Sequence, residues 1–163
     1  RNRYYLECDR TNGVMTVYTD SNKKYPIKTI RVSVGNPTSL TIAGTFTLTR
    51  SLRWQPLMGP SWGQYGTHVV NGIFVHSVAC GQANSYNLPV GEYLRLGNPA
   101  SHGCIRACVA DAKWVWDNCN GSKIHIFDGT YTSNEALKGP LGRKALTPLR
   151  GSKNFDPTDP ACK

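Results

Sequence analysis

The sequence lacks any run of roughly 18 apolar residues, the length that a membrane-crossing helix needs. It has no internal repeat and no low-complexity segment. Nor does it open with the basic and apolar stretches of a secretory signal, which a mature secreted form would lack as well. Because 163 residues is the usual size of one folded domain, we expect a single domain with no direct membrane insertion.

No segment carries a helical stripe of lysine and arginine, and no motif combines basic with aromatic residues as RNA-binding folds do. We therefore expect no nucleic acid partner, although the formal net charge is +9. The basic residues are scattered, and such a surface is attracted to polyanions in general. A bulk anionic environment, such as an acidic cell wall, is the one that this charge favours.

The number of cysteines favours an oxidising compartment. They are Cys8, Cys80, Cys104, Cys108, Cys119 and Cys162. If Cys104 is a free nucleophile, at most two disulfides can form among the rest. Cys108 and Cys119 are expected on one helix, about 16 Å apart, which is too far to bridge. Cys162, in a loop-rich tail, is then expected to pair with Cys8 or Cys119.

The first half of the chain has the short apolar segments and turn signals of β-structure. Asn12-Gly13 and Asn71-Gly72 are hairpin signals between such segments. The segment 57–66, rich in glycine, proline and aromatic residues, is expected to be a shaped loop. Expected strands cover 4–8, 14–18, 27–34, 41–49 and both arms of a hairpin within 67–78.

The second half contains one clear helical pattern. Apolar residues recur at helical spacing from Ile105 to Cys119, and Asn120-Gly121 then ends the helix. The segment 81–100 has no periodicity and is expected to be a long loop. Beyond the helix we expect a strand at 123–127, a helical turn at 135–138 and an extended tail. Many short strands with one helix predict a mostly β (α+β) fold, a sandwich or barrel with the helix on one side.

Cys104 has the setting that a cysteine nucleophile needs: a base, partial exposure and a positive potential. It follows Gly103, which lets a substrate approach the backbone closely. It also lies where the helix 105–119 is expected to begin, so that the helix dipole would lower its pKa. Two candidate bases are His102, two residues away, and His76, at the end of a predicted strand.

Two other interpretations of this cysteine stay open. A cysteine at a helix start is often a small buried apolar residue with no chemistry. Zinc bound by Cys104, Cys108, Cys119 and a histidine is the second interpretation, but the spacing is no close match to known zinc motifs. We therefore expect no metal.

The segment Ser101-His102-Gly103-Cys104-Ile105-Arg106 resembles the signature of the L,D-transpeptidase catalytic domain, the YkuD-type family. That signature is an upstream histidine, a spacer, serine or threonine, His-Gly-Cys, an apolar residue and asparagine or arginine. Segments that match the family in order are 32–35, 41–46, 72–77 with its upstream histidine, and 121–126. The resemblance implies a β-sandwich or barrel with one main helix after the cysteine, a catalytic domain at 1–128 and a C-terminal extension at 129–163.

The resemblance also implies a role for each residue of the motif. Cys104 is the nucleophile and His76 the base, and the backbone around Ser77 orients the imidazole. The N–H groups of Gly103 and Cys104 hold the oxyanion, and His102 supports the site. Residues expected to contact substrate are Ser101, Arg106, Trp62 and Tyr65.

Some of these roles have alternatives. Arg106 could hold a substrate carboxylate or only position its own loop. Ordinary packing is the alternative for Trp62 and Tyr65. The spacer at 77–100 is longer than the family's usual gap, and the extra length is expected to enlarge the loop beside the site.

The implied activity is that of a peptidoglycan L,D-transpeptidase, which needs no cofactor. Cys104 attacks the amide before the terminal D-Ala of a stem tetrapeptide, and the thioester passes to a side-chain amine to give a 3→3 cross-link. Carbapenems would acylate the same cysteine. We further expect an extracytoplasmic monomer. The alternatives are an L,D-carboxypeptidase, a papain-like cell-wall endopeptidase with His125 as base, and a non-catalytic wall-binding module that uses Trp54, Trp62 and Tyr65.

Overall fold

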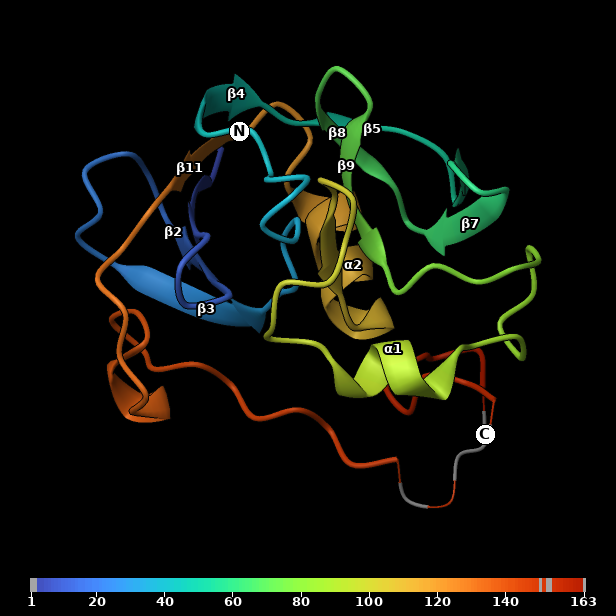
Figure 1. Ribbon diagram of the computed structural model, residues 1–163. Coiled ribbons are helices and arrows are strands. Elements are labelled where there is room, and N and C mark those ends of the chain that lie inside the picture. The colour runs from blue at the N-terminus through green and yellow to red at the C-terminus, as the bar shows by residue number, and fades with distance from the viewer. Residues whose placement is uncertain (1–2, 150, 152–153, 163) are drawn as a thin grey trace.

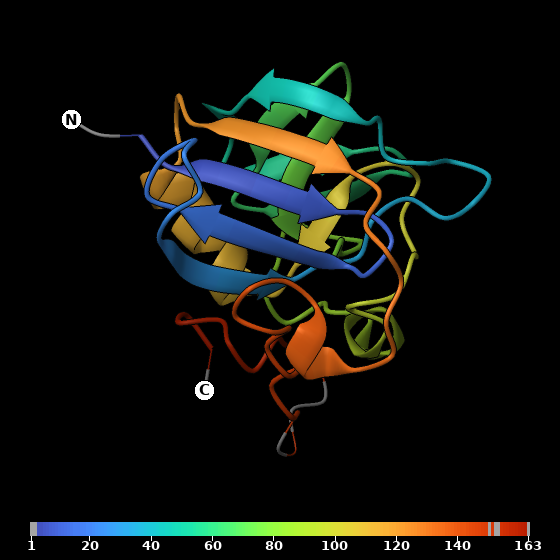
Figure 2. The same ribbon diagram turned by 90° about the vertical axis from the view of Figure 1, so that its left-hand side faces the viewer.

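The larger sheet of the fold has five strands, as the computed structural model shows for residues 3–149, 151 and 154–162. Its strands are β1 (Tyr5–Asp9), β2 (Val14–Tyr18), β3 (Pro26–Arg31), β4 (Gly44–Thr47) and β11 (Lys123–Phe127). They lie in the order β3-β2-β1-β11-β4 and face the viewer in Figure 2. β1 and β11 run parallel, and the other neighbours run antiparallel. Four of these strands match expected strands closely, and β4 is a shorter part of the fifth.

A second, four-stranded sheet carries the two segments that the sequence marks as functional. Its strands are β5 (Thr49–Arg50), β8 (Thr67–Val70), β9 (Ile73–Ser77) and β10 (Ile105–Ala107), in the order β10-β9-β8-β5. β8 and β9 are the hairpin predicted around Asn71-Gly72, and β9 runs parallel to β10. β6 (Trp54–Leu57) and β7 (Ser61–Gln64) pair with each other as a two-stranded sheet.

The hydrophobic core lies between the two large sheets. Side chains alternate between the faces of a strand, so Leu6 and Cys8 of β1 and Ile124 of β11 point inward together and are fully buried. Val75 of β9 and Ile105 of β10 join them in the same cluster. The apolar anchor of each functional strand is therefore fixed in the core, which leaves the opposite face free for the site.

Three helical segments complete the described part of the chain. They are α1 (Val90–Leu94), α2 (Val109–Asn118) and the 3₁₀ turn η1 (Glu135–Leu137). α2 packs against β9, β10 and β7, and Figure 1 shows it beside β9, with α1 below it. No helix within the described residues is both long and apolar enough to span a bilayer.

The structure corrects the predicted start of the main helix. The helix begins at Val109, with Cys108 as its N-cap residue, and not at Ile105. The intervening residues form β10, because Arg106 pairs with His76 on one side and bridges to Ser33 on the other. A local apolar period cannot distinguish a helix from a strand that finds partners on both edges.

Two predicted loops also contain regular structure. The segment 57–66 holds most of the β6–β7 hairpin, whose strands pair from Trp54 with Gln64 to Leu57 with Ser61. The long segment 81–100 holds α1, a single short helix. Glycine and proline obscure the period of both segments in the sequence, so turn signals alone underestimate their order.

The cysteine pairing expected from the sequence is wrong. Cys8, Cys80, Cys104, Cys108 and Cys162 carry free thiols, so no bridge ties Cys162 to Cys8 or Cys119. The expected partners are completely buried in the core, whereas Cys162 is half-exposed in the C-terminal tail.

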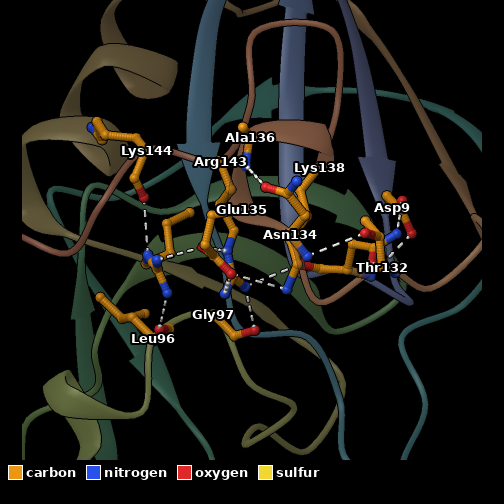
Figure 3. Close-up of polar contacts among 12 residues, drawn as sticks. Asp9, Leu96, Gly97, Thr132, Asn134, Glu135, Ala136, Lys138, Arg143 and Lys144 are labelled. Carbon is orange, nitrogen blue, oxygen red and sulfur yellow. Dashed lines mark hydrogen bonds and ion pairs between the residues drawn. The ribbon is translucent and has the colours of Figure 1, made fainter.

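The C-terminal extension is held to the domain by a charged cluster around Glu135 (Figure 3). The cations that contact its carboxylate are Arg31, Lys138 and Arg143. Arg143 also donates to the carbonyl of Gly97 at 2.7 Å, and Arg31 donates to that of Leu96 at 3.2 Å. The extension thereby connects β3 to the loop that follows α1.

Candidate active site

The register of β9 and β10 brings the candidate nucleophile and base onto one face. Ile105 pairs with Val75, and Arg106 with His76, so Cys104 lies opposite Phe74. Since Val75 and Ile105 point into the core, strand alternation directs their neighbours to the other face. Phe74, His76, Cys104 and Arg106 all line one cavity as a result.

This cavity has a volume of about 500 Å³ and three walls. One wall is the β8–β9 hairpin with Gly72 and Phe74, and another is the motif segment from Ser101 to Arg106. The third is the tip of the β6–β7 hairpin, which supplies Pro56, Leu57, Met58 and Ser61. A concave, mostly apolar site with a few polar groups is typical of a substrate pocket.

The Cys104 thiol is half-buried in this cavity. Its Sγ accepts a hydrogen bond from the N–H of Phe74 at 3.4 Å and lies 3.7 Å from the carbonyl oxygen of Gly72. Burial raises the pKa of the thiol, and the Phe74 N–H and the charge of Arg106 offset this rise only in part. The lowered pKa expected from a helix dipole is therefore wrong, because the helix begins four residues later, beyond β10.

His76 is held in one orientation. It is only 2% exposed, and its Nδ1 contacts the carbonyl oxygen of Ser77. A carbonyl can only accept, so we assign the proton of the neutral ring to Nδ1 and the free lone pair to Nε2. Burial, together with the charge of Arg106, lowers the pKa of His76 to about 4, although the bond to Ser77 acts in the opposite direction. At neutral pH the ring is thus an uncharged base.

Strand β7 supports this imidazole from behind, a feature that the sequence did not reveal. A Cβ atom added at Gly63 would lie 2.6 Å from His76 Nδ1, so no side chain fits between them. The next residue, Gln64, donates its N–H to Ser77 Oγ at 2.8 Å. An isolated glycine in a strand is a signal of close approach, and Gly63 could have been found on that ground.

The motif loop is closed by its own serine. Ser101 Oγ donates to the carbonyl of Cys104 at 2.6 Å and accepts from the N–H of Gly103 at 3.1 Å. Gly103 has φ +129°, which side-chain-bearing residues rarely adopt. Because the N–H of Gly103 already has a partner, its predicted role toward an oxyanion would require that bond to be shared or broken. His102 is exposed and lines the cavity.

Arg106 has a partner that the sequence did not predict. Its guanidinium donates to Glu92 Oε1 at 2.8 Å, and Glu92 lies on α1 inside the long spacer. Burial acts to raise the pKa of Glu92, but the hydrogen bonds and charges of Arg106 and, to a smaller extent, Arg95 outweigh it and hold the pKa below its usual value. The lengthened spacer therefore brings a carboxylate to the arginine of the motif.

Two of the residues expected to contact substrate do not line the cavity. Tyr65 is 6% exposed and packs edge-on against Trp116 at 5.4 Å between ring centres. Trp62 pairs through its backbone with Cys80. Tyr65 therefore has a packing role, and the cavity takes Ser61 from β7 where Trp62 was expected. Ser101 and Arg106 do line it.

His125, the base of the papain-like alternative, lies on the larger sheet. Its Nδ1 is 2.7 Å from Glu7 Oε2, and its ring stacks on Phe127. It does not line the cavity that contains Cys104. The candidate base that lines the cavity with Cys104 is therefore His76, which precedes the cysteine in the chain.

A mostly β fold with a half-buried cysteine and a buried, oriented histidine on adjacent strands defines a Cys–His site of the acyl-transfer type. The family model of the L,D-transpeptidase catalytic domain, YkuD, matches residues 3–136. The chain therefore belongs to this family. The match runs past residue 128, the expected end of the catalytic domain, and leaves 137–163 outside.

Solved structures with the same fold include several L,D-transpeptidases. That of Mycobacterium smegmatis has a TM-score of 0.56 at 21% identity, over 77% of this chain and 59% of that one. An L,D-transpeptidase from Mycobacterium tuberculosis H37Rv has a TM-score of 0.60 at 17% identity, over 78% of this chain and 58% of that one. L,D-transpeptidase 3 from Mycobacterium tuberculosis, with a faropenem-derived adduct, has a TM-score of 0.58 at 18% identity, over 78% of this chain and 61% of that one. The chain spans about three-fifths of each of these, and their identities establish likeness of fold alone.

One short match is closer in sequence. The YciB protein of Bacillus subtilis (strain 168) is 59% identical over 27 residues, which is 17% of this chain and 14% of that protein.

Proposed function

We propose that this chain is a peptidoglycan L,D-transpeptidase in which Cys104 is the nucleophile and His76 the base. The observation that carries the proposal is that a half-buried thiol and a neutral, oriented imidazole line the same cavity. Family membership supplies the reaction class, and this geometry supplies the groups that the reaction needs.

The first half-reaction releases D-Ala. Cys104 Sγ attacks the carbonyl carbon of the third stem residue while His76 Nε2 takes the thiol proton. The carbon–nitrogen bond to the terminal D-Ala then breaks, and the proton passes from His76 to the leaving amine. The product is a thioester on Cys104 and free D-Ala. The neutral resting state of both groups makes His76 a general base at the moment of attack.

The second half-reaction restores the thiol. A side-chain amine of a second stem attacks the thioester carbonyl and gives its proton to His76, and the carbon–sulfur bond breaks. The sulfur regains that proton, and the new amide is a 3→3 cross-link. Water in place of the amine would make the enzyme an L,D-carboxypeptidase.

Charge supports an anionic substrate and an extracytoplasmic place of action. Arg106 is a cation that lines the cavity and is placed to bind a stem carboxylate. Glu92 forms an ion pair with it and neutralises part of its charge. The net charge of +9 suits an anionic wall. A carbapenem would acylate Cys104 by the same attack on a strained amide.

Mass spectrometry of the protein after a carbapenem tests the proposal. The parent should gain one adduct, Cys104→Ala should gain none, and Cys162→Ala, which removes another half-exposed thiol, should react like the parent. No adduct on folded parent, or an adduct on Cys104→Ala, would refute it. With disaccharide-tetrapeptide as substrate, a dimer plus D-Ala indicates transpeptidation, whereas a tripeptide alone indicates the carboxypeptidase.

A further inference from the structure

The C-terminal tail reaches the back of the active site, although it lies beyond the residues that the family model matches. Figure 1 shows the red tail close to α1, below α2. Contacts in agreement with this view join Leu88 to Asn154 and Val109 to Asp156. The tail thus packs on the spacer and on the start of the main helix, which are the two elements that flank β10 in the chain.

One buried tail residue bonds to the strand that supports His76. Asp159 is 3% exposed, and its Oδ2 accepts from Gln64 Nε2 at 3.1 Å. Gln64 is 2% exposed and donates its backbone N–H to Ser77 Oγ. Gly63, the residue before it, lies against the imidazole without room for a side chain. A continuous set of contacts therefore runs from Asp159 through β7 to His76.

Asp159 is itself fixed by a compact turn in the tail. Its Oδ1 accepts from the N–H of Ala161 at 2.9 Å, and its own N–H donates to the carbonyl of Asp156 at 3.0 Å. Asp156 and Thr158 accept from the first two N–H groups of α2, at 2.9 and 3.0 Å. The tail thus caps the N-terminus of α2, which needs such acceptors, and the carboxylate of Asp159 has little freedom to move.

Strand β7 needs this support because its own pairing is slight. β6 and β7 form a sheet of two strands, which is marginally stable alone. Beyond that sheet, β7 packs against α2 and bonds to the end of β9 at two points, the bridge between Trp62 and Cys80 and the hydrogen bond from Gln64 to Ser77. The Oε1 of Gln64 is buried with no hydrogen-bond partner in the described structure, so Asp159 is the acceptor that stabilises this side chain in the interior. Loss of Asp159 would leave the whole amide unsatisfied, which favours a shift of β7 toward water.

We propose that Asp159 is a positioning residue of the transpeptidase site. Through Gln64 it holds β7 against His76, and β7 in turn keeps the imidazole in place to take the thiol proton of Cys104. The expected effect of Asp159 on the reaction rate rests on the proposed function. Its expected effect on the placement of His76 does not. It assigns to the extension beyond the family match a direct part in the geometry of the base.

The test compares four variants of the 163-residue chain with the parent. Asp159→Ala and Gln64→Leu remove the bond, Asp159→Asn keeps an oxygen acceptor, and Thr158→Ala removes a cap of α2 from the same turn without touching β7. We expect a carbapenem to acylate the first two variants about tenfold more slowly than the parent, when rates are compared at the same fraction of folded protein. Asp159→Asn should recover most of the rate, and Thr158→Ala should keep it while losing thermal stability.

An NMR titration of the His76 ring protons separates this proposal from the proposed function. In Asp159→Ala the pKa of His76 should rise toward 6.5 because the imidazole becomes less buried, and in Thr158→Ala it should stay near that of the parent, about 4. An unchanged His76 titration in Asp159→Ala, or losses in rate that only follow thermal stability across all variants, would overturn the positioning role. If the parent does not react with a carbapenem at all, the proposed function fails while the titration still decides the role of Asp159.

Discussion

The backbone N–H of Phe74 donates to Cys104 Sγ across 3.4 Å, from one parallel strand to the next. This bond holds the proposed nucleophile at the edge of the four-stranded sheet. The thiol is protonated at neutral pH, because burial raises its pKa above the ordinary 9.0 more than the Phe74 N–H and Arg106 lower it. Attack at neutral pH must then depend on a base that accepts the proton during the reaction.

The pH profile of acylation by a carbapenem should report this base. With the pKa of His76 at about 4, the rate should be level through neutral pH and fall as the pH approaches 4. In His76→Gln the rate should drop about 100-fold at neutral pH and then rise with pH as thiolate forms. Stopped-flow absorbance of the β-lactam measures both profiles. A parent rate that follows the thiolate fraction would contradict the general-base mechanism.

Gly63→Ala should impair the site with little effect elsewhere. Its Cβ would lie 2.6 Å from His76 Nδ1 and 2.7 Å from Cγ, so the imidazole or β7 must move. We expect acylation to slow by about tenfold to 100-fold, as displacements of about 1 Å do. The matched control is Gly91→Ala, whose Cβ meets no atom within 4 Å. Because Gly91 lies in α1, the control should gain about 0.5 kcal/mol of stability and keep the parent rate.

Local patterns predicted the strands of the larger sheet well, because each has an apolar face or a clear turn signal beside it. Asn71-Gly72 predicted the hairpin that carries His76. The helix start was wrong by four residues, because the partners of β10 at His76 and Ser33 are remote in sequence. The motif predicted Cys104 and His76 as site residues, and the register of two parallel strands explains how the residues on either side of the spacer come to lie on one face.

The parts of the site that the sequence did not predict depend on tertiary contacts. Glu92 meets Arg106 only because the spacer folds into α1. Asp159 meets Gln64 across 95 positions of the chain. Neither residue belongs to a motif or to a periodic segment, and a carboxylate in a loop is usually solvated. Such contacts become visible only when the packing is known.

Glu92→Gln should make Cys104 more reactive. The variant keeps a hydrogen-bond acceptor for Arg106 but removes the charge that neutralises it, and the uncompensated cation lowers the pKa of the thiol. A decrease of about half a pKa unit would raise the rate of alkylation by iodoacetamide about threefold at neutral pH. Asp117→Asn, which makes the same change in net charge on α2, should leave that rate unchanged. Equal effects of the two variants would show a general change in potential instead.

His76 should also make the fold sensitive to acid. Its pKa is about 4 when folded and 6.5 ordinarily, so between these values the unfolded chain binds more protons and the free energy of unfolding increases with pH. The full stability is present above 6.5 and is lost progressively down to 4, a change of about 3 kcal/mol. Urea unfolding at the two ends of this window should show that His76→Gln lacks this part of the slope. A parent and variant with equal slopes would mean that the ring is protonated as readily in the fold as outside it.

Glu135→Ala should loosen the C-terminal extension more than a surface ion pair would suggest. Its carboxylate meets Arg31, Lys138 and Arg143 (Figure 3), and all three cations are largely buried, with side-chain exposures of 15%, 8% and 7% in that order. Without Glu135 they keep their charge but lose its partner, so we expect a loss of about 2 kcal/mol by chemical unfolding.

The control for Glu135→Ala is Asp128→Ala. Asp128 is 62% exposed and pairs with Arg10 at 2.8 Å, and loss of such a surface pair should cost no more than about 1 kcal/mol.

The pKa of Glu135 is held at about 2, chiefly by the Arg143 hydrogen bond. Its contribution is therefore present above the ordinary carboxyl pKa of 4.5 and decreases as the pH falls toward 2. Arg143 and Arg31 donate to the carbonyls of Gly97 and Leu96, so Glu135→Ala should also raise the rate of amide hydrogen exchange in the loop after α1. Equal exchange rates in Glu135→Ala and Asp128→Ala would show that Glu135 stabilises the tail alone.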